Sequence, residues 1–306
     1  MVEFDGHNLS DVTAYFTNVH QTRSVTINNV LLDGASGGSD GDDTEQVIDI
    51  IEAISMAPAL SQLRIYIAPS STVFSGGDTI IFNQMATDNI AKQLSGSWNW
   101  SPADPTADDP IFKEFAAQGQ TFFTASGDYG AYPEQPYFYP EEDPNVTAVG
   151  GTIRTTSSAG GAWASEIAWG GANTACSGAG SGGVLSQDGG AIPSYQQISG
   201  VINSSNKGST TLRNVPDVAA EGNCDNYYCA NGSCGEGLGG TSLAAPTWAG
   251  FMALVNQNNA SRGKSTGGFI NPTIYPIGVE SSYHNYFHDI TVGDNSTAIV
   301  HLCIRR

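Results

Sequence analysis

Apolar and polar residues follow two different patterns along the N-terminal half of the chain. Short apolar or β-branched runs bounded by turn residues are typical of strands, and longer segments with apolar residues three or four positions apart are typical of helices. Because strands that alternate with helices form parallel βαβ units, this pattern predicts an α/β fold with a mainly parallel sheet covered on both faces. The predicted strands span residues 24–33, 63–69, 91–98, 121–127 and 145–152, and the predicted helices span about 8–20, 44–57, 78–90 and 108–118.

Residues 155–240 differ in composition, because they are rich in glycine, serine and asparagine and have little periodicity. We expect long surface loops with short strands there, since no sustained apolar periodicity supports a second core. A further apolar stretch, "LAAPTWAGFMALV" at 243–255, predicts a buried helix. The whole chain, 1–306, is therefore predicted to form a single domain.

The charge of the chain excludes some classes of binding partner. Thirty acidic residues against eleven basic ones give a net charge of −19, which repels nucleic acid and anionic lipid. No run of eighteen apolar residues occurs, so we expect no membrane-spanning segment. The charge fits either a solvated acidic surface, common in exported proteins, or work at about pH 4, where protonation reduces self-repulsion. Composition alone favours the first interpretation.

Three of the five cysteines crowd into "NCDNYYCANGSCG" at 223–235. No CxxC pair and no nearby histidine supports zinc, so a loop closed by disulfides is the better interpretation, with the pairing left open. Disulfides indicate an oxidising compartment, and we expect a secreted protein. The opening "MVEFDGHNLS" is not a signal peptide, so an export signal would lie outside this chain.

The segment "GGTSLAAPTWAG" at 239–250 is built to hold Ser242 at the start of a helix. Gly239 and Gly240 permit a close approach of the backbone, and Pro246 is expected near the first turn, where proline is tolerated. A hydroxyl in this place meets backbone N–H groups that favour developing negative charge, as a serine nucleophile requires, although a simple N-cap has the same pattern. Such a nucleophile needs a base, usually histidine, yet no histidine lies in a glycine-rich catalytic context.

Glu45 and Asp49 offer an alternative base. They lie four residues apart on the helix at 44–57, for which Asp43 or Thr44 is the expected cap, so both carboxyl groups face the same side. Like charges at this spacing destabilise a helix unless they share a proton, in which case one carboxylate can act as base while the other orients it. The alternative interpretation is that the two acids lie near the start of the helix because negative charge there interacts favourably with the helix dipole. Glu45 fits this interpretation better than Asp49 does.

Asp128 follows the predicted strand at 121–127 in the motif "SGDYG". In an open parallel sheet, ligands bind beyond the carboxyl ends of the strands, which is where this side chain would lie. An ordinary turn aspartate is the simpler interpretation of this residue taken alone.

Taken together, these motifs resemble the sedolisins, serine-carboxyl peptidases that use glutamate where subtilisin uses histidine. The family's SGTSxxxP motif stands as "GGTSLAAP" at 239–246, its Glu-x-x-x-Asp motif as Glu45–Asp49 and its SGDxG motif at 126–130, in the family's order. The similarity covers nearly all of residues 1–295. It implies a subtilisin-like three-layer α/β/α fold with a mainly parallel central sheet, forming a single peptidase domain. The N-terminus looks clipped, the family's pro-segment is absent, and the tail from about 296 to 306 is atypical.

The resemblance also implies roles for the four motif residues. Ser242 would form the acyl-enzyme, Glu45 would be the general base, Asp49 would orient it, and a neutral Asp128 would donate a hydrogen bond to the oxyanion. A carboxylate base is poorly matched to neutral pH, so acid activity follows. The implied function is an acid-acting endopeptidase of proteins and peptides. A tripeptidyl-peptidase of the same family and an inactive truncated fragment remain the alternatives.

Further positions carry over from the family by resemblance alone. Glu3 and Trp98 match residues that extend the hydrogen-bond chain behind the catalytic pair, although Trp98 fits a core aromatic equally well. Ser97 and Trp98 would lie on the strand that receives substrate. Asp289 and Ile290 match half of a Ca²⁺ site, but "NSTAIVHLCIRR" downstream lacks the glycines and aspartate of the other half, so the site is expected to be incomplete. The implied partners are substrates and the family's own pro-segment, and the chain is expected to be a monomer.

Overall fold

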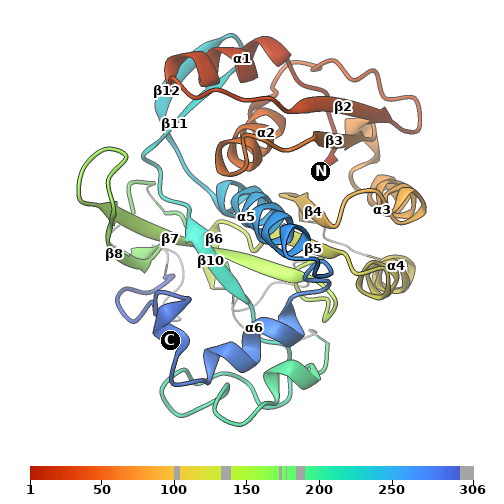
Figure 1. The fold of residues 1–306 in the computed structure, drawn as a ribbon. Helices are drawn as coiled ribbons and strands as arrows, with labels where there is room; N and C mark the ends of the chain where they lie inside the picture. Colours follow the sequence, from red (N-terminus) through yellow and green to blue (C-terminus); the bar gives the residue numbers. More distant parts are fainter. Residues whose placement is uncertain (100–103, 132–138, 172–173, 177, 184–189, 297–306) are drawn as a thin grey trace.

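The computed structural model describes residues 1–99, 104–131, 139–171, 174–176, 178–183 and 190–296 (Figure 1). Among these residues, eight strands form one central sheet: β1 (Val2–Glu3), β2 (Thr26–Leu31), β3 (Gln62–Ile67), β4 (Gln93–Gly96), β5 (Thr121–Ala125), β7 (Thr147–Thr156), β8 (Trp163–Ala168) and β10 (Val218–Glu221). The strand order is β10-β7-β5-β4-β1-β3-β2, with β8 paired to β7 outside this path. All pairings in the sheet are parallel except that of β7 with β8.

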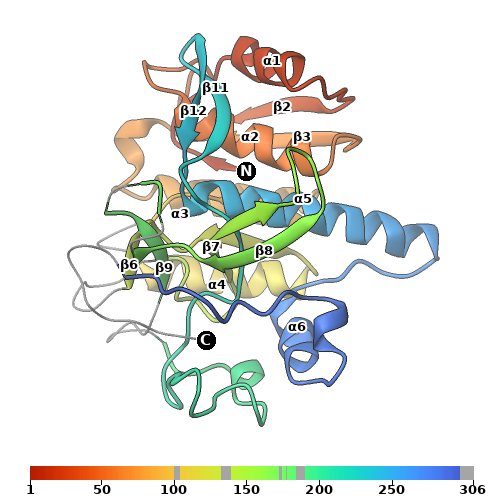
Figure 2. The ribbon, with the colours of Figure 1, turned by 90° about the vertical axis from the view of Figure 1, so that its left-hand side faces the viewer.

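Helices cover both faces of the sheet. The α-helices are α1 (Leu9–Asn18), α2 (Thr44–Met56), α3 (Gly77–Asp88), α4 (Pro105–Ala117), α5 (Thr241–Ser261) and α6 (Asn271–Gly278), with short 3₁₀ turns at Ser70–Thr72, Ser194–Gln196 and Tyr283–Asn285. Helices α3 and α4 lie on one face, and α2 and α5 lie on the other (Figures 1 and 2). Along β3, Tyr66 joins the core under α3 and α4, whereas Ile65 and Ile67 join the core under α2, as the two-residue period of a strand requires. The predicted three-layer α/β/α architecture is confirmed.

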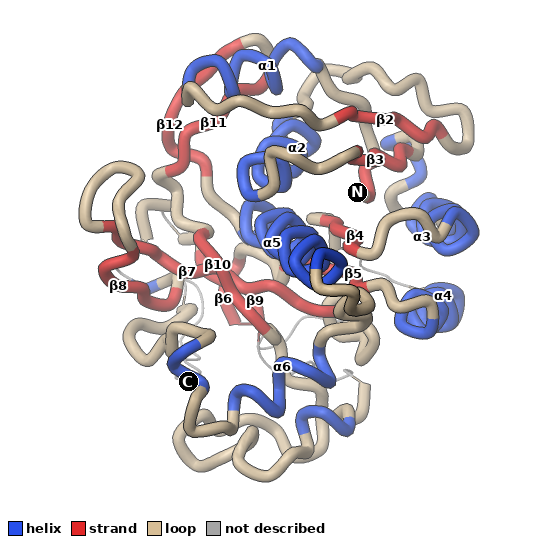
Figure 3. The backbone as a smooth tube through the Cα atoms, viewed as in Figure 1, coloured by secondary structure: helices blue, strands red, loops and turns tan. Residues whose placement is uncertain are grey.

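The predicted elements of the N-terminal half are all present, with ends that differ by a few residues. The five predicted strands correspond to β2, β3, β4, β5 and β7, and the four predicted helices to α1 through α4. Between 155 and 240, the chain is mostly loop, as predicted (Figure 3). One finding there is that Val218–Glu221, which the pattern did not mark, forms the edge strand β10 of the central sheet.

Two smaller sheets accompany the central one. Strand β6 (Tyr129–Ala131) pairs with β9 (Gly180–Gly183), and β11 (Asn226–Ala230) forms a hairpin with β12 (Ser233–Leu238). Disulfides Cys229–Cys234 and Cys176–Cys224 confirm the disulfide-closed loop, while Cys303 lies outside the described residues. No helix in the described part of the chain is both long enough and apolar enough to cross a bilayer.

Small residues on α5 bring this helix close to α2 and to the sheet. Ala244, Ala245 and Ala249 are buried, and a Cβ atom on Gly250 would lie 2.8 Å from the carbonyl oxygen of Ala53 on α2. The two helices can therefore approach each other more closely than larger side chains would allow. This contact places the N-terminal turns of α2 and α5 side by side, and both turns carry candidate catalytic residues.

The start of α5 differs from the prediction in one respect. The helix begins at Thr241, so Pro246 lies in its second turn and not near the first. Proline has no backbone N–H, and therefore the carbonyl group of Ser242 loses its helical partner. The Ser97 hydroxyl lies 3.4 Å from that carbonyl oxygen instead.

Candidate active site

Ser242 is the second residue of α5 and is 8% exposed. The helix follows a turn in which Gly240 has φ +142, a conformation that other residues rarely adopt. A Cβ atom on Gly240 would also lie only 2.9 Å from Asp128 Oδ2. Glycine is thus required here, and it lets the turn before Ser242 approach the Asp128 side chain.

Asp128 is held by the residue that precedes the serine. The backbone N–H and the hydroxyl of Thr241 both donate to Asp128 Oδ1, at 2.7 and 2.9 Å, and the Gly127 N–H donates to the Thr241 hydroxyl at 3.0 Å. Burial raises the pKa of Asp128, and the two hydrogen bonds from Thr241 oppose this rise. Because both bonds go to Oδ1, Oδ2 is the oxygen on which a proton can reside.

Glu45 and Asp49 lie on α2, as predicted from their spacing. Asp49 is fully buried and accepts a hydrogen bond of 2.7 Å from the Ser97 hydroxyl, while Glu45 is half-buried. Burial, followed by the negative charge of Asp49, raises the pKa of Glu45 well above its usual value, and hydrogen bonding to Ser242 opposes the rise. Burial, followed by the negative charge of Glu3, also raises the pKa of Asp49 well above its usual value. The carboxyl groups therefore cannot all ionise together and must share protons.

Glu3 and Trp98 extend this group of carboxyls toward the sheet. The Trp98 indole N–H donates to Glu3 Oε2 at 3.2 Å, and Glu3, on strand β1, is completely buried. Burial and then the charge of Glu45 raise the pKa of Glu3 to about 8. The Trp98 ring also packs edge-to-face on Phe4, with ring centroids 5.3 Å apart. Trp98 thus packs against the core and also donates to Glu3, while its part in a hydrogen-bond chain behind the catalytic pair remains a prediction.

Comparison with known proteins decides the family. Residues 11–274 match the Subtilase family. The solved structure of Pseudomonas sedolisin, a serine-carboxyl proteinase complexed with two molecules of pseudo-iodotyrostatin, matches this chain with a TM-score of 0.77 and 30% identity. That match covers 96% of this chain and 83% of the solved one. The chain belongs to the sedolisin family.

The matches to curated relatives cover only part of the length of those proteins. Sedolisin from Pseudomonas sp. (strain 101) is 33% identical over 311 residues, which cover 92% of this chain and 49% of that protein. Tripeptidyl-peptidase sed1 from Aspergillus fumigatus is 40% identical over 83 residues, which cover 27% of this chain and 12% of that protein. The chain thus spans about half the length of the first relative, and its match to the second covers a small part of that protein.

Ser97 has a contact in the structure that the sequence did not predict. It follows the end of β4 at Gly96, so the strand predicted to include Ser97 and Trp98 ends earlier than expected. The Ser97 hydroxyl contacts Asp49, which makes this serine part of the carboxyl group network. Substrate binding by the backbone at these two positions remains a prediction. Thr241 was also missed, although a hydroxyl directly before the proposed nucleophile was a signal that could have found it.

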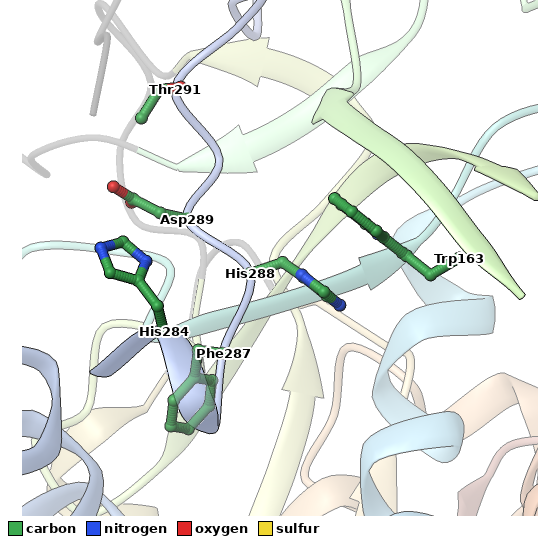
Figure 4. Close-up of a pocket in the computed structure, with 6 residues that line it drawn as sticks. All are labelled: Trp163, His284, Phe287, His288, Asp289 and Thr291. Carbon is green, nitrogen blue, oxygen red and sulfur yellow. The ribbon is translucent and has the colours of Figure 1, made fainter. Parts of the chain in front are cut away.

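Asp289 and Ile290 are the residues predicted to bind calcium. Asp289 is exposed and lines a shallow pocket of about 350 Å³ together with Trp163, His284, Phe287, His288 and Thr291 (Figure 4). The Trp163 and His288 rings stack with centroids 3.7 Å apart. Within the described ranges, no group of three or more histidine, cysteine, aspartate or glutamate side chains could hold a metal ion. Calcium needs about six oxygen ligands. The incomplete site at Asp289 and Ile290 therefore stays a prediction, and the atypical tail at 297–306 lies outside the described residues.

Proposed function

We propose that the chain is an acid-acting serine-carboxyl endopeptidase. The observation that carries this proposal is the gathering of one serine hydroxyl with carboxyl groups whose pKa values are all raised by burial. Ser242 lies at the start of α5, Glu45 and Asp49 lie on the neighbouring α2, and Asp128 is held against the turn before the serine. Perturbed carboxyl groups beside a hydroxyl are the parts that acid-range acyl transfer requires.

In the first step, Ser242 Oγ attacks the carbonyl carbon of a peptide bond, and its proton moves to the ionised Glu45. The new C–O bond forms while the carbonyl electron pair moves onto the oxygen. Asp49, which is held by Ser97, keeps Glu45 oriented and shares a proton with it, so that Glu45 can be ionised while Asp49 is neutral. A neutral Asp128 donates a hydrogen bond to the oxyanion from Oδ2, because Thr241 occupies Oδ1.

In the second step, the C–N bond breaks and the leaving amine takes the proton from Glu45. The acyl group stays on Ser242 as an ester. Water then attacks this ester with Glu45 again as the base, and the acid product leaves with the serine restored. Each step moves one proton between the serine or water oxygen, Glu45 and the leaving group, so one base serves both halves of the reaction.

This mechanism sets the pH at which the chain works. Glu45 must be ionised while Asp128 keeps its proton, and ionisation of Asp128 would place a negative charge beside the oxyanion. As pH rises through the raised pKa of Asp128, the oxyanion donor is lost. We expect kcat/KM for a chromogenic peptide to be highest in acid and to vanish toward neutral pH. An optimum at pH 7 or above would reject the carboxyl base.

A tripeptidyl-peptidase is the second candidate, favoured by the local similarity to tripeptidyl-peptidase sed1. The two activities can be distinguished by assaying a pair of peptides that differ only in whether the N-terminus is acetylated. An endopeptidase cleaves both peptides, whereas a tripeptidyl-peptidase releases three residues from the free N-terminus and leaves the acetylated peptide intact. Export to an acidic, oxidising compartment is supported by the two disulfides and the acidic composition, and it belongs to the same proposal.

A further inference from the structure

The β11–β12 hairpin lies directly before the helix that carries the proposed nucleophile. Its strands are joined by the turn at Asn231 and Gly232, and the directly paired Cys229 and Cys234 form a disulfide across them. Strand β12 ends at Leu238, two residues before the N-cap of α5 (Figure 1). Any displacement of the hairpin is thus passed along a very short linker to the start of α5.

The tip of this hairpin binds the other catalytic helix. The Asn231 N–H donates to Asp43 Oδ1 and the Asp43 N–H donates to Asn231 Oδ1, both at 3.0 Å. The Asn231 side-chain amide also donates to Asp42 Oδ1 at 2.8 Å and to the Thr44 hydroxyl at 3.0 Å. Asn231 has φ +54, a left-handed conformation that asparagine tolerates better than most residues. One residue of the hairpin therefore contacts three consecutive residues at the start of α2.

These contacts matter because the first turn of a helix has N–H groups without helical partners. The N-cap of α2 is Asp43, but its side chain makes no capping bond and instead accepts hydrogen bonds from Asn231 and from the backbone and side chain of Asn8. Asp42 provides the cap, because its Oδ1 accepts from the Thr44 N–H at 3.0 Å. Glu45 is the next residue along the chain, so the hairpin tip holds the cap that fixes the turn carrying the proposed base.

The hairpin is itself anchored along its length by α1 (Figure 2). The Gly232 N–H donates to Asp11 Oδ2 at 3.1 Å, and the Asn18 side chain donates to the Tyr227 hydroxyl at 2.8 Å. The Tyr15 ring stacks on Tyr227 with centroids 6.1 Å apart. Because α1 holds both β11 and the tip, the tip can act as a fixed reference for α2.

We infer that the disulfide-closed hairpin of residues 226–238 is a brace that sets the position of Glu45 relative to Ser242, with Asn231 as the positioning residue. The hairpin is joined covalently to the nucleophile helix and through hydrogen bonds to the base helix, so it fixes both ends of the proton-transfer pair. The inference rests on the proposed function, because it concerns the placement of the proposed base. Asn231 contacts Asp42, Asp43 and Thr44, so it would act on Glu45 through the turn before it.

The central test is the Asn231→Gly variant of the full chain, since glycine keeps the left-handed backbone and removes only the side chain. A displacement of about 1 Å at a catalytic group costs on the order of 10²-fold in rate, so we expect kcat to fall between about 10- and 100-fold, with KM within about 2-fold. Hydrogen bonding from Ser242 lowers the pKa of Glu45. If the variant weakens this hydrogen bond, the pKa of Glu45 rises, and the acid limb of the kcat/KM profile, where activity is lost as pH falls, should move to higher pH. A role in stability alone would not move this limb.

Ser233→Ala is the matched control, because Ser233 lies in the same hairpin and, among the described residues, its hydroxyl contacts only the Ala230 carbonyl, at 3.4 Å. It should keep the kinetics and the pH profile of the wild type. Replacing Cys229 and Cys234 together by alanine should shift kcat and the acid limb in the same direction as Asn231→Gly. If the Asn231→Gly variant does not fold, this double variant provides the test of the brace in its place.

Amide hydrogen exchange of residues 44–48 tests the brace without any turnover. We expect these amides to exchange at least about 10-fold faster in Asn231→Gly than in the wild type, with Ser233→Ala unchanged. An inactive wild type would overturn the proposed function, while the exchange rates would still support or overturn the brace. An active wild type whose kcat, acid limb and exchange rates are all unaffected by Asn231→Gly would overturn the inference alone.

Discussion

On the face covered by α3 and α4, the core of the central sheet is largely aromatic, whereas on the face covered by α2 and α5 a mainly aliphatic core surrounds the carboxyl groups of the candidate active site. Phe112 contacts Phe82 and Phe122 on the first face, with ring centroids 4.9 and 5.5 Å apart. On the second face, Asp49 and Glu3 are buried without exposure. Burying carboxyl groups opposes folding, and burying aromatic rings favours it. The comparison indicates that both faces bury an apolar core, and that the α2 and α5 face also carries the cost of burying the carboxyl groups proposed for the chemistry.

The largest expected effect tests the chemistry of the α2 and α5 face. Ser242→Ala and Glu45→Gln should each lower kcat by on the order of 10⁴-fold or more, because both residues belong to one proton-transfer unit. The melting temperature should stay close to that of the wild type or rise in Glu45→Gln, since a buried acid is replaced by a neutral amide. Peptide turnover and circular dichroism measure the two properties. Substantial turnover by a folded Ser242→Ala chain would show that the nucleophile is misassigned.

The next effect tests the aromatic face. Phe112 is completely buried, so Phe112→Ala should lower the free energy of unfolding by about 3–5 kcal/mol, while kcat at a temperature where the chain stays folded is unchanged. Ile80→Ala on α3 is the control, because Ile80 is 40% exposed and its removal should cost less than about 1 kcal/mol. Urea unfolding at acid pH gives both values. A large loss of kcat in folded Phe112→Ala would contradict the division of roles between the two faces.

A third prediction concerns the pH dependence of stability. The pKa of Glu3 is raised to about 8 in the folded chain, above its value of about 4.3 when unfolded. The folded state therefore binds more protons between these values, so the stability is fully present below about pH 4 and is lost as pH rises toward about 8. Glu3→Gln should flatten this decline. Chemical unfolding between pH 4 and 8 measures it, with Glu236→Gln at an exposed site on β12 as the control. Equal slopes in all three chains would show that Glu3 does not bind this extra proton.

The smallest expected effect concerns calcium. Asp289 and Ile290 provide too few ligands, so millimolar calcium should raise the melting temperature by less than about 1 °C relative to chelator. Asp289→Ala should behave like the wild type in both conditions. A large rise that disappears in Asp289→Ala would demonstrate a complete site and contradict the expected one. Thermal unfolding at acid pH provides the measurement.

Local pattern was enough to predict most of the fold. The parallel strands and α1 through α4 were predictable because apolar runs and helical spacing are properties of neighbouring residues. Strand β10 escaped prediction because "VAAE" is short and contains two alanines, and its place depends on pairing with β7. The prediction that Pro246 lies near the first turn of the helix was wrong, because the helix already begins at Thr241 within "GGTS". Thr241 is held there by its contact with Asp128.

The site was predictable only where its chemistry shows within one segment. Glu45 and Asp49 were found because two acids four residues apart on an apolar helix are unusual, and Ser242 because glycines precede a helix. The contacts of Ser97 and Asn231 could not be found in this way. Their partners on α2 lie 48 and 188 residues away along the chain, so only the folded structure brings them together.

The distance along the chain between Glu45 and Ser242, nearly two hundred residues, has a consequence for synthesis. A ribosome adds about 5–20 residues per second, so tens of seconds or less separate the appearance of the base from that of the nucleophile. During this interval the nascent chain holds Glu45, and later Asp49 and Asp128, but it does not yet contain Ser242. Helix α5 also contributes to the core beneath the sheet, so packing and catalytic competence are completed by the same late segment. Under the proposed function, catalytic competence therefore cannot precede completion of this core.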